Sequence, residues 1–334
     1  MKKLMGLLLG SALLFTACKK NDIAPGDDSL ADDVTAAAPT QRQCASDDVY
    51  QQQIKNNPAL RQRMEAIEAF TNRFTQDRGH AGRLLANGII EIPVVFNVIY
   101  RTATENISLA QLQSQIDVLN EDYAALNADY NNTPATFTGV RSGDVGVRFV
   151  LDQVIRKSST KTSWSTNDAM KKSSSGGINA TSPTTKLNIW VVNKMTQAGQ
   201  TILGYAQFPG GASATDGVVL GYNFTGRVGT LSAPFNKGRT ATHEVGHWMN
   251  LRHIWGDATC GSDLVGDTPT HNTANVGCPA VGHRSTCSGT PIEMTMNYMD
   301  YSDDACMYMF SAGQKTRMLA TFAVGGPRNS FAQP

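Results

Sequence analysis

The sequence predicts an α/β domain with a mixed, mostly parallel twisted sheet, followed by an irregular C-terminal part. Residues 89–100 are β-branched or apolar at most positions, which is typical of a strand buried on both faces of a sheet. Shorter apolar runs then alternate with helical periodicity. After residue 255, Cys, Gly, Asp and Pro replace any regular pattern. We expect the domain over residues 83–334, with one subdomain ending at about residue 253 and a second over 254–334.

A helix and four further strands complete the expected sheet domain. Ser108 followed by Gln111 forms a capping box, which marks a helix start. Apolar residues then recur at helical spacing, so we expect a helix over residues 109–126 that packs against the sheet. Its apolar face comprises Leu109, Leu112, Ile116, Leu119, Tyr123 and Leu126. Strands are expected at apolar runs between Ser-, Gly- and Thr-rich loops. These runs are 145–151, 187–192, 203–208 and 218–222.

The composition is that of an ordinary globular protein. Of the 334 residues, 41% are apolar, which is enough for one sizeable domain and an N-terminal extension. The 29 basic and 28 acidic side chains leave a net charge of only +1, and no long basic stripe could neutralise a phosphate backbone. We therefore expect no nucleic-acid partner. We also expect a monomer.

The N-terminus has the pattern of an export signal. Residues 1–17 begin with two lysines and continue with an apolar stretch over residues 4–15, which is too short to span a bilayer. A membrane anchor helix is the alternative. Cys18 follows as in bacterial lipoprotein cleavage sites, although Phe15 stands where such sites usually have Leu. We expect lipidation at Cys18 and an outer-membrane or cell-surface location, with a freely secreted or periplasmic protein as the alternative.

Two segments lie between the signal and the domain. Residues 18–43 contain almost no large apolar side chain, so they cannot offset the entropy of ordering and should form a flexible tether. Residues 44–82 carry a helical pattern over 49–74. An Arg- and Gly-containing stretch follows over 78–83. We interpret residues 44–82 as a pro-segment with a cleavable junction.

Three histidines and a glutamate form the strongest candidate for chemistry. His243, Glu244 and His247 have HExxH spacing, which places both imidazoles on one helix face. His253 lies too far along to face inward from the same helix, so the chain must turn back. We place that turn at Asn250, because Asn tolerates a left-handed backbone. Three neutral imidazoles would hold one catalytic zinc with a position left for water, beside which Glu244 would act as general base.

HExxH alone also arises by chance on amphipathic helices, so further features are needed. The third histidine falls at metzincin spacing, the helix follows several strands, and Met299 lies in a tight downstream turn. Methionine is more often core filler than a platform under a metal. Together with the extended histidine motif, however, Met299 favours a metalloenzyme.

From about Ile89 to the C-terminus, the chain resembles the pappalysin family of metzincin peptidases, especially its short, bacterial, ulilysin-like members. One departure is Asn250, where metzincins place Gly. The shared phrases are QIDVLNEDY, LNIWVVN, GYAQFPG, GRTATHEVGHWMNLRHIWGD and NYMDYSDDACMYMF. The resemblance implies a sheet domain with a backing helix and an active-site helix. It also implies endopeptidase action on proteins or peptides through zinc-assisted attack of water, with the proton passing through Glu244.

The resemblance assigns roles to two more residues. Tyr301 matches a family tyrosine near the metal that would hydrogen-bond the oxyanion, while a buried structural tyrosine is the alternative. Asp304 matches the acidic residue at the base of the pocket for the side chain after the scissile bond. It implies a preference for Arg or Lys at that position. A solvated surface aspartate is the alternative.

Five cysteines remain after Cys18, and in an exported protein four are expected to pair. The resemblance implies the pairs Cys260 with Cys287 and Cys278 with Cys306. A second zinc site is the alternative, although the short CxxC spacing that such sites favour is missing.

Two further metal contacts follow from the resemblance. Cys44 would occupy the fourth zinc position until the pro-segment is cut away, which makes the chain a latent zymogen; a merely unpaired thiol is the alternative. Asp263 and Thr268 match positions that bind structural calcium in family members, and Asp267 lies in the same loop.

Two rival functions remain at this stage. A surface binding protein could keep the zinc as a structural brace, but an inert relative would be expected to lose Glu244. A small-molecule metallohydrolase would use a pocket rather than an open cleft, and the Met299 turn and the pappalysin-like phrases argue against it.

Overall fold

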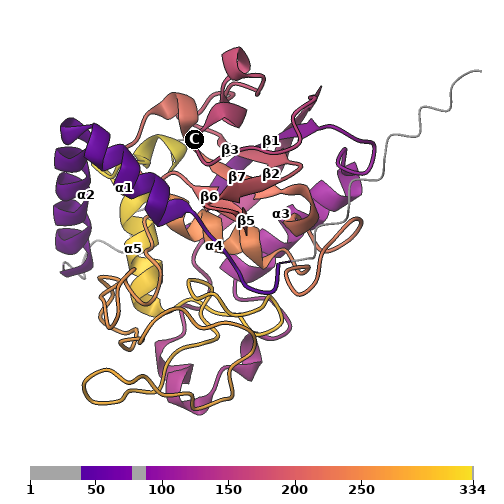
Figure 1. Cartoon of the computed structure of the whole chain (residues 1–334). Helices are drawn as coiled ribbons and strands as arrows, with labels where there is room; N and C mark the ends of the chain where they lie inside the picture. Colours follow the sequence, from indigo (N-terminus) through magenta and orange to yellow (C-terminus); the bar gives the residue numbers. More distant parts are fainter. Residues whose placement is uncertain (1–38, 77–87, 333–334) are drawn as a thin grey trace, which may run out of the picture. The chain divides into compact units, whose positions relative to one another are not determined.

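A computed structural model describes residues 39–76 and 88–332. Its centre is a five-stranded sheet in the order β2-β1-β3-β7-β6, in which β6 is antiparallel to β7 and every other pair is parallel (Figure 1). This confirms the predicted mixed, mostly parallel sheet. Its strands are β1 (Ile90–Tyr100), β2 (Val147–Ser158), β3 (Leu187–Val192), β6 (Gly204–Ala206) and β7 (Val218–Gly221). A separate hairpin pairs β4 (Met195–Gln197) with β5 (Gln200–Ile202).

Helices α3 (Leu109–Tyr123) and α4 (Arg239–Trp248) contact each other and the sheet (Figure 1). The Ser108 side chain accepts from the Gln111 N–H at 3.1 Å, as the capping box predicts. The helix ends before Leu126, because Ala125 adopts a φ of 56°. Leu109 and Leu126 are 58% and 74% exposed, so their predicted place in the core is wrong. The other four predicted apolar positions are buried.

The predicted helical stretch over 49–74 is two helices, α1 (Ser46–Asn56) and α2 (Pro58–Gln76). The break falls at Asn57, because Pro58 lacks an N–H and is favoured at the first position of a helix. The Asn57 side chain accepts from the Leu60 N–H at 3.2 Å, which caps the second helix. We call residues 39–76 the N-terminal segment.

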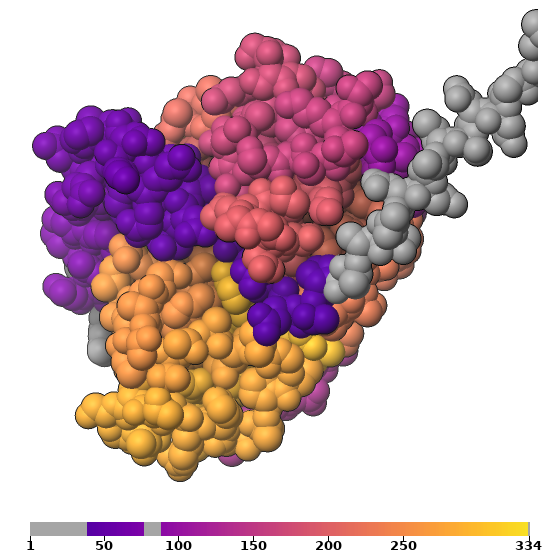
Figure 2. All heavy atoms as spheres, in the orientation of Figure 1, coloured from indigo at the N-terminus to yellow at the C-terminus, as the bar shows by residue number. Residues whose placement is uncertain are grey.

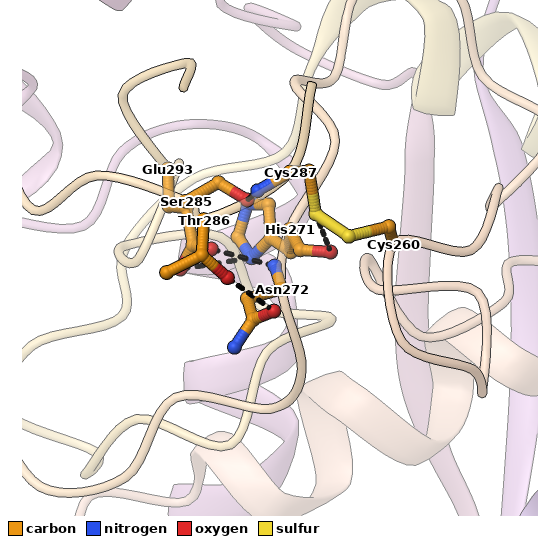
Figure 3. Close-up of a disulfide and its surroundings, with 7 residues drawn as sticks. All are labelled: Cys260, His271, Asn272, Ser285, Thr286, Cys287 and Glu293. Atoms are coloured by element: carbon orange, nitrogen blue, oxygen red, sulfur yellow. Dashed lines mark hydrogen bonds and ion pairs between the residues drawn. A yellow bond between two sulfur atoms is a disulfide. The ribbon is translucent and has the colours of Figure 1, made fainter. Parts of the chain in front are cut away.

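The C-terminal part is largely irregular, and two disulfides, Cys260–Cys287 and Cys278–Cys306, brace it. Figure 3 shows His271 beside the first disulfide, and its carbonyl oxygen lies 3.5 Å from Cys287 Sγ. One helix here, α5 (Ala312–Phe322), was not predicted from the sequence, although the Ser311 side chain and Gln314 form a capping box at its start.

The core extends over both faces of the sheet. One apolar cluster joins the sheet to α3, α4 and the methionine-rich C-terminal part, and a second covers the opposite face. Short 3-10 helices occupy the connections: Tyr130–Asn132, Ala135–Val140, Ala169–Lys171, Ser173–Ser175, Ser213–Thr215, Tyr222–Phe224 and Asn329–Ala332. Among the described residues, no helix combines the length and the apolar character needed to cross a bilayer. The predicted signal (residues 1–17) and Cys18 lie outside the described ranges, as do Arg78 and Arg83 in the predicted junction.

Candidate active site

Helix α4 presents His243, Glu244 and His247 on one buried face, and the chain reverses immediately after it. Asn250 has a φ of 71°, the left-handed backbone that the sequence analysis expects at this turn. The Leu251 N–H donates to the Gly246 carbonyl at 3.0 Å and closes the helix end. The turn therefore aims His253, which α4 itself could not point inward, back toward the other two histidines.

Met299 lies directly under α4, as the predicted Met-turn requires. A Cβ atom at Gly246 would lie 2.5 Å from Met299 Sδ, so only glycine permits this close approach. Met299 is completely buried, and its carbonyl accepts from the Ile254 N–H at 3.1 Å. The turn at Met299 thus supports both the helix and the returning chain that carries His253.

The three imidazoles converge through their Nε2 atoms. His247 Nε2 lies 3.1 Å from Nε2 of both His243 and His253. Each Nδ1 atom is held by an acceptor outside the cluster. The acceptor is the Tyr298 carbonyl at 2.6 Å for His243, the Leu251 carbonyl at 2.8 Å for His247, and the Asp257 carboxylate for His253. With protons on Nδ1, all three Nε2 lone pairs point to one centre.

Burial also keeps two of these rings neutral. It lowers the pKa of His243 well below its usual range, with His247 and His253 adding to the effect. Burial likewise lowers the pKa of His247 to about 3. Neutral imidazoles are the form that binds metal. Three buried, oriented nitrogen donors therefore fit a catalytic zinc ion.

A fourth donor comes from the N-terminal segment. The ligand atoms of Cys44, His243, His247 and His253 all lie within 4.8 Å of one another, and no other such group of three or more occurs in the described part of the chain. The Cys44 thiol also lies 3.3 Å from Glu244 Oε2. Cys44 is thus the one cysteine outside the two disulfides among the described residues, and it is buried against the histidines.

The same segment bonds Glu244 through its Oε2 atom. The Ser46 hydroxyl donates to Glu244 Oε2 at 2.9 Å and accepts from the Ala206 N–H at 2.8 Å. Burial raises the pKa of Glu244 to about 7, while the Ser46 and Cys44 hydrogen bonds act in the opposite direction. The carboxylate is placed to exchange protons, but here its partners belong to the protein itself.

Tyr301 faces the same cluster. Its hydroxyl accepts from the Cys44 N–H at 3.2 Å and donates to the Cys44 carbonyl at 3.1 Å. Its ring centroid lies 5.0 Å from that of His253. The hydroxyl is therefore beside the three converging histidines and bonds backbone groups of Cys44 there.

Asp304 is completely buried, which rules out the alternative of a solvated surface aspartate. Its Oδ1 atom accepts from the Arg42 guanidinium at 2.6 Å. Its Oδ2 atom accepts from the backbone N–H groups of Lys237 at 2.7 Å and Arg239 at 3.3 Å. Arg42 is itself only 1% exposed and lies over the Phe235 ring. A guanidinium is therefore buried between the Asp304 carboxylate and the Phe235 ring.

The N-terminal segment reaches these groups by pairing with the edge of the sheet. The Leu203 N–H donates to the Gln43 carbonyl at 2.9 Å, and the Ala45 N–H donates to the Gly204 carbonyl at 3.2 Å. This makes a parallel bridge between Cys44 and Gly204. Figure 2 shows the indigo N-terminal residues set between the salmon β6 region and the yellow C-terminal part.

The predicted calcium loop divides into two parts. Asp263 is buried, accepts from the Thr268 hydroxyl at 2.9 Å, and has its pKa raised to about 6 by burial. The Thr268 hydroxyl also lies 3.0 Å from the Val265 carbonyl, so three oxygen donors gather there. Asp267 points elsewhere and accepts from Ser311 and Gly313 at the start of α5.

Sequence reasoning missed three residues of the site: Arg42, Ser46 and Asp257. Arg42 and Ser46 flank Cys44 at two residues on either side, so an Arg-x-Cys-x-Ser pattern was available. Asp257, four residues after His253, is the last residue of the shared phrase GRTATHEVGHWMNLRHIWGD, which was the available signal.

Comparison with known proteins now decides the family. A model of the peptidase family described as pregnancy-associated plasma protein-A matches residues 178–323. Extracellular metalloprotease 1 of Coccidioides posadasii is 36% identical over 244 residues, which are 69% of this chain and 75% of that protein. The chain belongs to the pappalysin family of metzincin peptidases.

Solved structures of pappalysin relatives agree. Mature mirolysin of Tannerella forsythia, in complex with a cleaved peptide, is 42% identical, with a TM-score of 0.68 over 73% of this chain and 95% of its own. A promirolysin mutant from the same organism is 39% identical, with a TM-score of 0.76 over 87% of this chain and 97% of its own. This pappalysin is a zinc metalloendopeptidase, and the reading as a non-catalytic binding protein is not favoured.

Proposed function

We propose that this pappalysin cleaves peptide bonds that precede arginine and that the N-terminal segment keeps it latent. Both proposals rest on the buried contact between Arg42 and Asp304. Arg42 lies two residues before Cys44, whose thiol reaches the histidines. The segment fills the pocket with the side chain that a substrate would present there.

The chain's own residues divide the chemistry among them. His243, His247 and His253 would hold a zinc ion, which supplies Lewis acidity to the scissile carbonyl and to an attacking water. Glu244 takes the proton of that water on Oε2 and returns it to the leaving amine. The Tyr301 hydroxyl, which bonds a peptide group in the latent form, donates to the carbonyl oxygen as it becomes negative.

A peptide library tests the catalytic roles. The full-length protein is allowed to mature and is compared with Glu244→Ala at equal zinc content, with new termini read by mass spectrometry. We expect cuts before Arg from the parent protein, and a loss of about 10²–10⁴-fold in rate in the variant. Equal cleavage by both proteins would exclude Glu244 as the base.

The preference for arginine rests on the pocket's geometry. A guanidinium donates several N–H groups in one plane, and here it meets a completely buried carboxylate and an aromatic ring at once. A lysine ammonium would reach the carboxylate as a point charge but would lose the planar contact. We therefore expect Arg to be preferred over Lys.

Latency rests on how completely the segment occupies the catalytic groups. Cys44 meets the histidines, Ser46 meets Glu244, and both bonds of Tyr301 go to Cys44. Promirolysin covers a larger share of this chain than mature mirolysin does, which supports a pro-segment here.

Cobalt substitution tests the thiol directly. In the full-length protein, cobalt in place of zinc should show a thiolate charge-transfer absorption that Cys44→Ser abolishes, because the thiolate is the metal ligand. The same spectrum in both proteins would contradict a cysteine ligand.

Export is the remaining part of the proposal. The relatives are named extracellular metalloproteases, which supports secretion of this chain. We place a lipid on Cys18, and Cys18→Ser should move the protein from the membrane fraction to the soluble fraction. A parent protein found in the soluble fraction would leave a freely secreted or periplasmic protein, and a variant that stays in the membrane fraction would favour the membrane anchor helix.

We also propose a calcium ion at Asp263, Thr268 and the Val265 carbonyl, because three oxygen donors meet at a buried carboxylate. Calcium should raise the melting temperature of the parent protein, and Asp263→Asn should abolish that increase. An equal increase in both proteins would exclude this loop as the calcium-binding site.

A further inference from the structure

The N-terminal segment touches the catalytic domain at a second place, on the far side of the Asn250 turn. Glu68 and Thr71 of α2 each lie 3.4 Å from the Asn250 side-chain nitrogen. The Arg317 guanidinium forms an ion pair with Glu68 and donates through Nε to the Asn250 carbonyl at 2.7 Å. Asn250, which stands where metzincins place Gly, is thus a contact for α2.

This contact is desolvated, which makes its charges matter. Arg317, Asn250 and Thr71 are each only 1% exposed, and the Glu68 side chain is 17% exposed. Removing one partner of a desolvated ion pair leaves the other charge buried without compensation. The Asn250 N–H donates to the His247 carbonyl at 2.9 Å, but the side chains of these four residues bond one another and none of the three histidine rings.

Apolar packing extends the same surface. Leu60 and Met64 of α2 form a buried cluster with Phe208, and Ile67 packs against it. A Cβ atom at Gly210 would lie 2.7 Å from Ile67 Cδ1, so α2 comes close to the backbone there. Figure 1 shows α2 beside α5, and the two helices are in contact.

Helix α1 also packs against the domain: Val49 belongs to the buried apolar cluster of Trp190 and Tyr205, and the Tyr50 ring lies 5.3 Å from the Phe208 ring. A cavity of about 370 Å³ lies beside this contact, and both helices of the segment and the domain line it. Its lining includes Gln52, Gln53 and Asn56 of the segment and Thr166, Asn167 and Gln207 of the domain. Apolar contacts therefore hold both helices of the segment, and α2 adds to them the buried ion pair between Glu68 and Arg317.

We propose that α2 is an attachment point in its own right, through which residues 39–76 stay bound after the chain is cut between Gln76 and Gly88. The ligand of this surface is therefore a separate polypeptide, the chain's own cleaved segment. Its regulatory consequence rests on the proposed latency: the cut alone does not open the site, and activity appears only when the segment dissociates or is digested.

The test uses the full chain with a recognition sequence for a site-specific protease inserted between Gln76 and Gly88. Glu244→Gln prevents self-digestion and keeps a hydrogen-bonding group for Ser46. After cleavage, residues 39–76 should co-elute with the domain on gel filtration, and their dissociation rate is measured by dilution. Immediate separation of the two pieces would overturn the proposal, and latency of the uncut chain would be unaffected by that result.

Three variants assign the contact. Glu68→Gln should speed dissociation about ten-fold or more, because Arg317 loses its charged partner. Glu65→Gln, on an exposed position of the same helix, should leave the rate unchanged. Asn250→Gly keeps the left-handed turn and removes only the side chain, so the dissociation rate of the segment should rise about two- to five-fold. Equal rates for Glu68→Gln and Glu65→Gln would refute the role of α2.

Discussion

The active site contains two sets of groups that differ in how they are held. The three histidines and Asp304 belong to the catalytic domain, and backbone groups or Asp257 of the same domain orient them. Arg42, Cys44 and Ser46 come from the N-terminal segment and contact the functional groups themselves. The domain's set is complete without the segment, and under the proposed function the segment's set takes the places of substrate and water.

The largest expected effect concerns the pocket that both sets share. If Arg42 stands in for a substrate side chain, Asp304→Asn should lower kcat/KM for peptides with Arg after the scissile bond by about 10²-fold, because a buried guanidinium loses its counter-charge. Peptides with an apolar residue there should lose much less.

Asp303→Asn is the matched control, since it removes a neighbouring carboxylate that does not contact Arg42 Nη2. An equal loss for both peptide classes in Asp304→Asn would mean that the variant damages the domain rather than the pocket. In that case Arg42 would be an internal structural contact and not a substrate mimic.

Zinc affinity distinguishes the domain's set from the segment's set. Asp257→Asn removes the carboxylate that orients His253 and should weaken zinc binding about 10- to 100-fold in the mature protein, measured by competition with a chromophoric chelator. The Ser46 hydroxyl bonds Glu244, the Ala206 N–H and Cys44 but none of the histidines, so Ser46→Ala should weaken zinc binding far less, measured in the full-length protein that still contains this residue. A similar loss in both variants would remove the distinction between the two sets.

The contact between Ser46 and Glu244 should have a moderate effect. Ser46→Ala in the full-length protein should increase the rate of maturation about three- to ten-fold, because one hydrogen bond to a charged group and one to the Ala206 N–H are lost. Intact mass spectrometry over time provides the measurement. A rate equal to that of the parent protein would show that Ser46 adds nothing to latency.

The last effect, on stability and not on a rate, tests the support beneath the histidines. Gly246→Ala places a methyl group against Met299 Sδ and should destabilise the protein by about 1–3 kcal/mol, with reduced zinc content. Chemical denaturation measures the free energy of unfolding. Full stability in this variant would mean that Met299 moves freely and does not act as a platform.

The parts of the molecule that the sequence predicted are those with regular periods. The buried strand at residues 90–100, the strand at 187–192 and the helix carrying His243 follow from apolar runs and HExxH spacing. The Asn250 turn followed from the need to bring His253 back. Helix α5 was missed because its pattern lies among irregular loops, although Ser311 and Gln314 marked its start.

Contacts between distant segments could not be predicted in the same way. Arg42 and Asp304 are 262 positions apart, and nothing local to either residue indicates the other. Glu68 and Arg317 are likewise unconnected in sequence. Such pairs depend on how the N-terminal segment crosses the folded domain, which a single sequence does not encode in any short pattern.

The most direct test of the whole account compares the zinc-loaded full-length protein with the same protein after the N-terminal segment has been removed. Both are given a mixed peptide library, and the new termini are read by mass spectrometry. We predict cleavage before Arg only after the N-terminal segment is removed. Both forms should contain one zinc ion per protein. Equal cleavage by both forms would contradict the account, because the segment would then not mask the site.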